Sequence, residues 1–210
     1  MKNYLTDLIN YHCFFEQKIQ EKLTIISKID YLKKGQDIIK KDQYIKWFII
    51  LLEGKIRVWH QQDDREVTLY TISKYETCAY SIVSIEKQYQ SQVYASAITD
   101  SIILKIPTYQ VKALKKFASW QIYINQTLIN KYENLLSCIN TLSFKKIDQR
   151  IMEFLQNESE LNNNSIVEIS HQKLASEIGS TREVVSRKLK ELEKKGILKL
   201  DYRKILLISG

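Results

Sequence analysis

The sequence predicts an α+β protein in which an N-terminal antiparallel β-roll is followed by one long helix and a small C-terminal domain. Between about residues 31 and 107, short runs rich in Ile, Val, Tyr and Trp alternate with polar turns, which is typical of an antiparallel roll. After Pro107, the only proline, apolar residues recur at helical steps with no further helix breaker. The last third of the chain alternates helical and strand patterns and ends in a strand–turn–strand pattern.

Composition limits the class of protein. The chain has 210 residues, 44% of them hydrophobic, which is enough for one large or two smaller cores. No apolar run approaches the roughly 18 to 20 residues of a membrane span, and the N-terminal stretch lacks the cleavage site of a signal peptide, so we expect a cytoplasmic protein. The net charge of +8 favours polyanionic partners. From residue 143 onward, however, 13 basic residues face 10 acidic ones, so bulk charge does not single out the C-terminal domain.

The elements can be placed in order along the chain. Residues 5–28 show roughly helical spacing and predict one or two short helices. The predicted strands fall in residues 32–42, 47–60, 65–73 and 101–107. The predicted domains are a β-roll with N-terminal helices over 1–110, a dimerisation helix over 111–142 and a C-terminal domain over 143–210.

The long helix carries one apolar stripe. A helix of about 25 residues in a small protein extends past its own domain, so the stripe predicts a parallel, coiled-coil-like dimer, with packing across its own sheet as the alternative. Lys131 falls near the seam and leaves the register open. Ser143 is predicted to cap the next helix, over 144–158. The stripe consists of Trp120, Ile124, Leu128, Leu135 and Ile139.

Two short helices joined by a tight turn are predicted near the C-terminus. The first runs from His171 to Glu177 behind a Ser170 cap, and Gly179 supplies the turn. Thr181 caps the second, which runs to about Lys195. The predicted buried side chains are Leu174, Ala175, Ile178, Val184, Val185, Leu189 and Leu192.

The outward face of the second helix fits DNA recognition. Arginine can bind guanine with two donors and glutamate can accept from cytosine, so a face that carries Arg182, Glu183, Ser186, Arg187 and Lys190 suits a recognition helix. The hairpin that follows would form a wing on the phosphate backbone. A solvated charged face of an ordinary amphipathic helix is the alternative. The predicted phosphate contacts are Ser170, Thr181, Lys190, Arg203 and Lys204.

The segment LASEIGSTREVVSRKLKELEKKGILKL, which begins at Leu174, resembles the winged helix-turn-helix of the cyclic-AMP receptor/fumarate-nitrate regulator (CRP/FNR) family. The resemblance extends over residues 15–208 and implies a cupin-like effector roll of the cyclic-nucleotide-binding-domain type. It implies base contacts by Arg182, Glu183 and Arg187, and by Ser186 as in the anaerobic-regulator branch of the family. It also implies a two-fold symmetric site with a TGA-like core in each half. It also implies double-stranded DNA, a second copy of the chain and RNA polymerase as partners.

The effector region departs from the family pattern. Tyr75 stands where cyclic-AMP binders have glycine, although Glu76 remains. No arginine occurs from 66 to 149, so the residue that grips the cyclic phosphate is missing and cyclic AMP is not expected. An iron–sulfur cluster is not expected either, because Cys13 stands alone near the N-terminus.

The sequence does not identify a cofactor or an effector. Haem is conceivable through His12, His60 or Cys78 but is not favoured, and Cys78 is also a candidate for thiol oxidation. The effector itself is unknown. The residues expected to line its pocket are Glu76, Thr77, Cys78, Tyr80 and Ser81.

The sequence thus predicts a sequence-specific transcription regulator. It contains no glycine-rich phosphate loop, nucleophile elbow or metal-ligand cluster, so an enzyme is not expected. The alternative function is a ligand-binding module whose DNA binding is non-specific or architectural.

Overall fold

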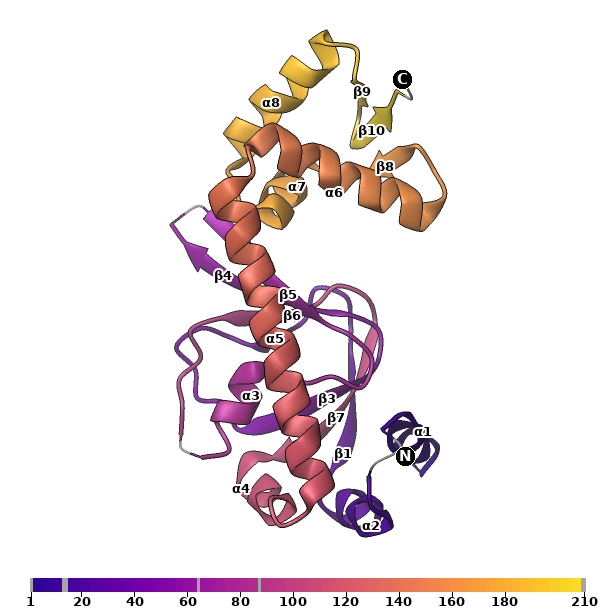
Figure 1. The fold of residues 1–210 in the computed structure, drawn as a ribbon, viewed down its shortest axis with the longest axis vertical. Helices are drawn as coiled ribbons and strands as arrows, with labels where there is room; N and C mark the ends of the chain where they lie inside the picture. Colours follow the sequence, from indigo (N-terminus) through magenta and orange to yellow (C-terminus); the bar gives the residue numbers. More distant parts are fainter. Residues whose placement is uncertain (1, 13–14, 64, 87, 209–210) are drawn as a thin grey trace. The chain divides into compact units, whose positions relative to one another are not determined.

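The computed structural model describes residues 2–12, 15–63, 65–86 and 88–208 of the chain (Figure 1). Its contacts divide the chain into two compact units. The first comprises residues 1–59 and 69–135, and the second comprises residues 60–68 and 136–210. The tip of one roll hairpin is thereby grouped with the C-terminal residues.

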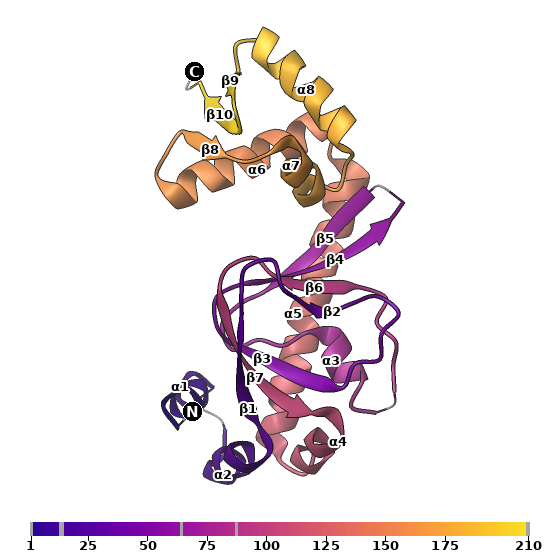
Figure 2. The same cartoon turned by 180° about the vertical axis from the view of Figure 1, so that it is seen from behind.

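The roll consists of two antiparallel sheets, as the strand pattern predicts (Figures 1 and 2). One sheet has the order β1-β7-β3 and the other β2-β6-β4-β5. The bounds of the first sheet are β1 Lys28–Leu32, β3 Trp47–Glu53 and β7 Ser101–Pro107. Those of the second are β2 Asp37–Ile39, β4 Ile56–Gln62, β5 Arg65–Ile72 and β6 Tyr94–Ala97.

Strand β3 is apolar from Trp47 to Leu52 because both of its faces are covered there. Alternate side chains of a strand point to opposite faces. Phe48 and Ile50 pack into a core shared with the helices, whereas Ile49 and Leu51 pack between the two sheets. A strand in this position needs a continuous apolar run rather than an alternating one, which explains the sequence from Trp47 to Leu52.

Helices cover the outer face of the sheet β1-β7-β3. The pair α1 Lys2–Tyr11 and α2 Gln17–Ile26 confirms the prediction of one or two short helices in residues 5–28. Their buried side chains, among them Leu8, Ile19 and Leu23, belong to the same core as Trp120 of the long helix α5 (Ala118–Phe144). The shorter helices of the unit are α3 Ala79–Val83, α4 Thr108–Val111 and the 3₁₀ turn Lys112–Leu114.

The long helix α5 spans Ala118–Phe144. The predicted break at Ser143 is wrong, because Ser143 lies inside the last turn of α5. Lys146 has extended backbone angles and is the residue before α6, which spans Ile147–Asn162. The backbone N–H of Lys146 donates a hydrogen bond of 3.0 Å to the Gln149 side chain. The helix boundary is therefore fixed by a glutamine that reaches back to the cap, not by a serine cap.

The second unit is built around one core of its own. Side chains of α6, the helix pair and the terminal hairpin contribute to it, including Ile151, Leu174, Val185 and Ile205. The strands form an antiparallel sheet of order β8-β10-β9. The remaining bounds are β8 Ile166–Glu168, α7 His171–Ile178, α8 Arg182–Lys194, β9 Leu198–Asp201 and β10 Lys204–Leu207.

An ion pair between a buried lysine and a half-buried glutamate joins α5 to the roll within the first unit. The Lys131 ammonium lies 2.6 Å from the Glu76 carboxylate and 3.5 Å from the Thr71 carbonyl, and it sits over the Tyr70 ring. Lys131 is only 1% exposed, so its placement near a dimer seam is wrong. The Tyr123 hydroxyl adds a hydrogen bond of 3.2 Å to the Tyr75 carbonyl. Buried charges need such partners, which makes these contacts specific.

Replacing Lys131 by Met should destabilise the protein by about 1–3 kcal/mol, because the Glu76 carboxylate would keep its desolvation without its cation. Urea unfolding measures the change. The double variant Lys131→Met/Glu76→Gln should recover part of the loss, since it removes both charges. The exposed Lys112→Met variant is the control, and an equal effect at both positions would contradict the importance of the pair.

Candidate nucleic-acid interface

Helices α7 and α8 begin at the residues that the predicted N-caps indicate. The Ser170 hydroxyl accepts a hydrogen bond from the N–H of Lys173 at 3.2 Å, and the Thr181 hydroxyl accepts one from Val184 at 3.4 Å. Both predicted N-caps are thereby confirmed. Between the helices, Gly179 adopts φ +64°, a conformation that costs glycine little. Ala175 is fully buried, as its small side chain suggests.

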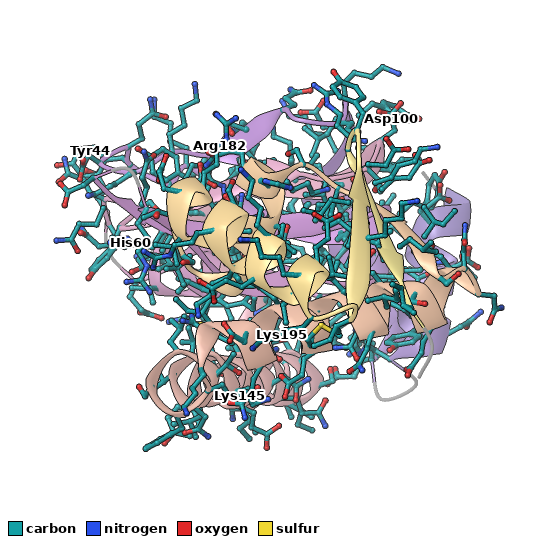
Figure 3. All side chains as sticks on the ribbon, turned by 90° about the horizontal axis from the view of Figure 1, so that it is seen from above. Tyr44, His60, Asp100, Lys145, Arg182 and Lys195 are labelled. Carbon is teal, nitrogen blue, oxygen red and sulfur yellow. The ribbon has the colours of Figure 1, made fainter. Side chains whose placement is uncertain are left out.

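Helix α8 divides its residues between a buried and an exposed side. Val185, Leu189 and Leu192 enter the core of the second unit. The predicted base readers Arg182, Glu183 and Arg187 are exposed, as is Lys190, and Ser186 is half-buried. Figure 3 shows Arg182 at the start of α8 and Lys195, the residue after its last turn, at the other end. The structure therefore brings the four predicted readers together on one accessible stretch of α8.

Sequence reasoning missed a contact made by His171. Its Nδ1 atom lies 2.9 Å from the hydroxyl oxygen of Ser186, which links the start of α7 to α8. Burial lowers the pKa of His171, and the positive charges of Arg182 and Lys190 lower it further. The neutral imidazole is thus favoured, and it restrains one of the predicted readers. Nothing in the spacing of the sequence marks this pair.

Two arginines that the sequence did not single out bind the carbonyl end of α7. The Arg150 guanidinium donates to the carbonyl of Ile178 at 2.7 Å, and Arg65 donates to the carbonyl of Gly179 at 2.9 Å. Carbonyls at a helix C-terminus carry partial negative charge, so cations stabilise them. Burial and the neighbouring Arg65 charge lower the pKa of Arg150. The turn before α8 is therefore held from two directions.

The hairpin-tip segment, residues 60–68, contributes further contacts within the second unit. The Ser176 hydroxyl donates to the Glu66 carboxylate at 2.6 Å, and the Thr68 hydroxyl donates to Glu177 at 3.3 Å. A Cβ added at Gly179 would lie 2.6 Å from a methyl carbon of Leu142. Glycine is favoured there by its positive φ, and the end of the Leu142 side chain would have to shift to admit a Cβ.

The terminal hairpin has the shape of a wing. Strands β9 and β10 pair directly, and Arg203 adopts φ +54° in the turn between them. Tyr202 and Arg203 are exposed at the tip. Lys204, a predicted phosphate contact, forms an ion pair of 3.2 Å with Glu168 across β10 and β8, and both side chains are mostly exposed. An exposed pair of this kind is weak and leaves the ammonium accessible to a phosphate.

Two known domain families match the chain in sequence. The family model of the cyclic nucleotide-binding domain matches residues 29–116, and the model of the Crp-like helix-turn-helix domain matches residues 149–209. Together they cover most of the chain, in the order in which the roll and the helix pair occur. The chain belongs to the CRP/FNR family of transcription regulators. A comparison with curated proteins gave no match.

Solved structures share the fold of this regulator at low sequence identity. A transcriptional regulator of the crp/fnr family from Eubacterium rectale is 24% identical over 93% of this chain and 91% of its own, with a TM-score of 0.83. The c-di-GMP responsive regulator CLP from Xanthomonas campestris is 17% identical over 93% and 100%, with a TM-score of 0.78. FixK2 from Bradyrhizobium japonicum is 18% identical over 88% and 94%, with a TM-score of 0.63.

The predicted effector residues of the regulator lie in a tightly packed part of the roll. Glu76 is engaged by Lys131, and Cys78 is fully buried with its sulfur 3.6 Å from the Tyr70 hydroxyl. Burial raises the pKa of the Cys78 thiol, which disfavours the reactive thiolate. The hydroxyls of Thr77 and Ser81 are buried without a hydrogen-bond partner in the described part of the chain. The remaining predicted residue, Tyr80, packs with its ring against Tyr89.

His12 is one of the candidate haem ligands in the sequence. His12 lies among aromatic rings, and its Nε2 atom lies 3.3 Å from the Tyr75 carbonyl. Burial lowers the pKa of His12. Within the described ranges, no cluster of His, Cys, Asp and Glu could hold a metal ion. No helix in that part of the chain has the length and apolarity to cross a membrane. Cys13, the predicted lone cysteine, lies outside the described residues.

The predicted dimer residues of α5 do not share one exposed face. Trp120 and Ile124 are buried in the core with α1 and α2, and Leu135 packs against the core between the sheets. Their assignment to a dimer face is corrected, because their surfaces are already covered within the chain. Leu128 and Ile139 are exposed. A partner helix would therefore contact a set of α5 residues other than the predicted one.

His171 in the free regulator should titrate below its ordinary value near 6.5, since burial, Arg182 and Lys190 all oppose protonation. The unfolded chain would then bind more protons than the folded one, so this group stabilises the fold above about pH 6.5 and loses that contribution as pH falls toward its folded pKa. NMR titration measures the pKa. Arg182→Ala should raise it, whereas Lys195→Ala should not, and identical values in both variants would contradict the assignment.

Proposed function

We propose that this regulator binds a two-fold symmetric DNA site as a homodimer and reads bases through Arg182, Glu183, Ser186 and Arg187. The observation that carries the proposal is the exposed stretch of α8 behind a capped glycine turn. The N-terminal turns of such a helix enter the major groove with their side chains on base edges. RNA polymerase is a further partner that family membership suggests.

Phosphate contacts would surround the reading helix. The helix N-termini at Ser170 and Thr181 offer N–H groups and positive dipole ends to phosphate oxygens. Lys190 lies one turn beyond the readers, and Arg203 and Lys204 lie on the wing. These groups position the protein on the duplex without reading sequence. They would also make the affinity depend on salt.

An exposed apolar stripe on α5 supports the dimer. Ile122, Ile129 and Leu136 are spaced by seven residues, and Tyr132 and Ile139 lie three residues after the last two. All five are exposed, and this spacing is that of the a and d positions of a coiled coil. A second copy of the same helix would cover the stripe symmetrically. Parallel helices would then present two α8 helices to two half-sites.

The roll is proposed to respond to something other than cyclic AMP, or to need no ligand. The Glu76 carboxylate that the family pattern retains is occupied by Lys131 from the chain's own helix. No arginine between 66 and 149 is present to neutralise a cyclic phosphate. A buried phosphate without a cation would be poorly compensated, so the residues do not fit that ligand.

Arg187→Ala should relax discrimination at one base position of each half-site by about 1–3 kcal/mol, because a bidentate contact to one base is lost. Lys204→Ala should weaken all sequences alike and reduce the slope of log affinity against log salt by about 1. Binding-site selection and salt titration measure both. Uniform loss for Arg187→Ala, or diffuse rather than localised protection in footprinting, would contradict sequence-specific reading.

Ile129→Asp should convert the dimer to a monomer, since each α5 would place a carboxylate in the apolar seam. Light scattering coupled to size exclusion measures the mass. The control is Asn134→Asp, which adds the same charge at an exposed position outside the stripe. A dimer that survives Ile129→Asp would show that another surface joins the subunits.

A further inference from the structure

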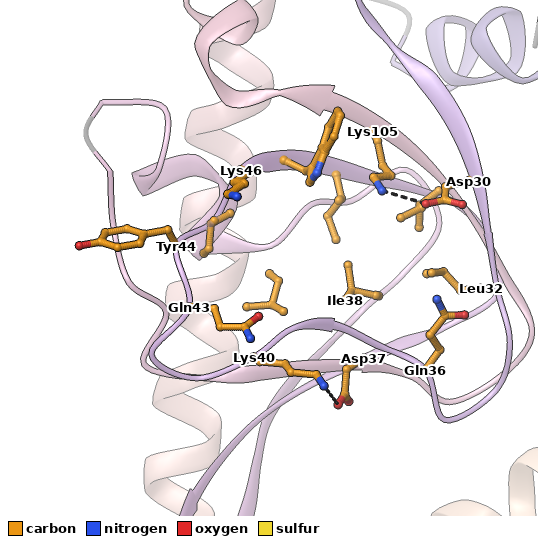
Figure 4. A pocket seen from close by; sticks show the side chains of 15 residues that line it. Asp30, Leu32, Gln36, Asp37, Ile38, Lys40, Gln43, Tyr44, Lys46 and Lys105 are labelled. Atoms are coloured by element: carbon orange, nitrogen blue, oxygen red, sulfur yellow. Dashed lines mark hydrogen bonds and ion pairs between the residues drawn. The ribbon is translucent and has the colours of Figure 1, made fainter.

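A half-open cavity of about 310 Å³ lies in the roll, where the edge strands of its two sheets face each other (Figure 4). Strand β1 is the edge of one sheet and β2 the edge of the other, and the 40–46 segment after β2 borders the opening. No residue of α3 or α5 lines this cavity. It is therefore separate from the region around Glu76 and Lys131.

The inner wall of the cavity is apolar. Ile39, Ile49 and Ile103 line it and belong to the core between the sheets, and Ile38 lies half-buried beside them. Figure 4 shows the Ile38 side chain near the middle of the ring of labelled polar residues. A wall of this kind binds the hydrocarbon part of a ligand by excluding water.

The rim of the cavity carries both paired and unpaired charges. Lys105 pairs with Asp30 at 2.8 Å, and Lys40 pairs with Asp37 at 3.7 Å. Lys46, a third rim lysine, takes part in no ion pair among the described residues and is exposed at the opening. The rim therefore has both of its carboxylates neutralised and one cation left over.

Positive charge is further concentrated at the Lys105 end of the cavity. The ring of Trp47, which lines the cavity, has the ammonium of Lys105 at 4.8 Å and that of Lys28 at 4.6 Å from its centroid. Asp30 is the one carboxylate paired with this cluster in the described residues. Two like charges on one ring favour an additional anion nearby, because it would offset their repulsion.

We propose that this cavity binds a small organic molecule with an apolar body and one carboxylate. The carboxylate would lie at Lys46 and the Lys105 end of the rim, and the body would cover the isoleucines. The volume is at the lower end of the range for ligand pockets, about 300–1,000 Å³, so the ligand is compact. A bound molecule would bridge the edge strands β1 and β2, which belong to different sheets, and would stabilise the roll.

Saturation-transfer NMR and thermal shift on the full chain test the proposal, with 3-phenylpropionate and its uncharged counterpart 3-phenylpropanol as probes. We expect saturable binding of the acid, a rise in melting temperature, and at least tenfold weaker binding of the alcohol. Phenylalanine, which adds an ammonium group, should bind no more tightly than the acid. Equal binding of acid and alcohol, no binding of either, or preference for phenylalanine would overturn the assignment.

Variants of the rim give the second arm of the test. Lys46→Gln should weaken binding of 3-phenylpropionate about tenfold, and Lys46→Arg should restore most of it. The control is Lys41→Gln, since Lys41 lies in the same segment but does not line the cavity. Circular dichroism checks that the variants are folded. If Lys46→Gln and Lys41→Gln bind the acid equally well, the site is not where the proposal places it.

Discussion

Helix α5 has more apolar surface than one chain can cover, and much of the structure depends on how that surface is divided. Trp120, Tyr123 and Ile124 are buried against the roll and the N-terminal helices. The stripe that contains Ile129 and Leu136 stays exposed. Burial of the first face fixes the rotation of the helix, so it also fixes which residues remain for a partner. Lys131 supports this rotation, because a buried ammonium tolerates little displacement from its carboxylate.

A similar division between a buried and an exposed side determines the rotation of α8. The buried positions Val185, Leu189 and Leu192 set the rotation of α8, and the helical period then places Arg182 and Arg187 in solvent. The turn at Gly179 sets where the helix begins. Rigidity at that point matters for recognition, since base contacts depend on the helix N-terminus. The arginines on the α7 carbonyls and the His171–Ser186 contact supply that rigidity.

Two regions of the roll, the surroundings of Glu76 and the cavity at the sheet edges, differ in whether their cations are already paired with carboxylates. Around Glu76, the chain supplies its own cation and fills the space with aromatic and sulfur groups. At the edge of the sheets, the acidic groups are paired and Lys46 is left over beside an apolar cavity. The first arrangement disfavours an anionic effector because its cation is already used. The second favours one because a cation and water-excluding surface lie together.

The sequence by itself determined the antiparallel roll, the long helix and the capped helix pair with its terminal hairpin. Each of these follows from local rules: period-2 and period-3.6 apolar spacing, serine and threonine caps, and a glycine that tolerates positive φ. The exposure of Arg182, Glu183 and Arg187 on α8 follows for the same reason. Only the tertiary structure decided which face of α5 is buried, where Lys131 points, and that Arg65, Arg150 and His171 contact the α7 end, the turn before α8 and α8 itself. These features depend on contacts between residues far apart in the chain. An apolar stripe on a helix does not reveal which other surface covers it.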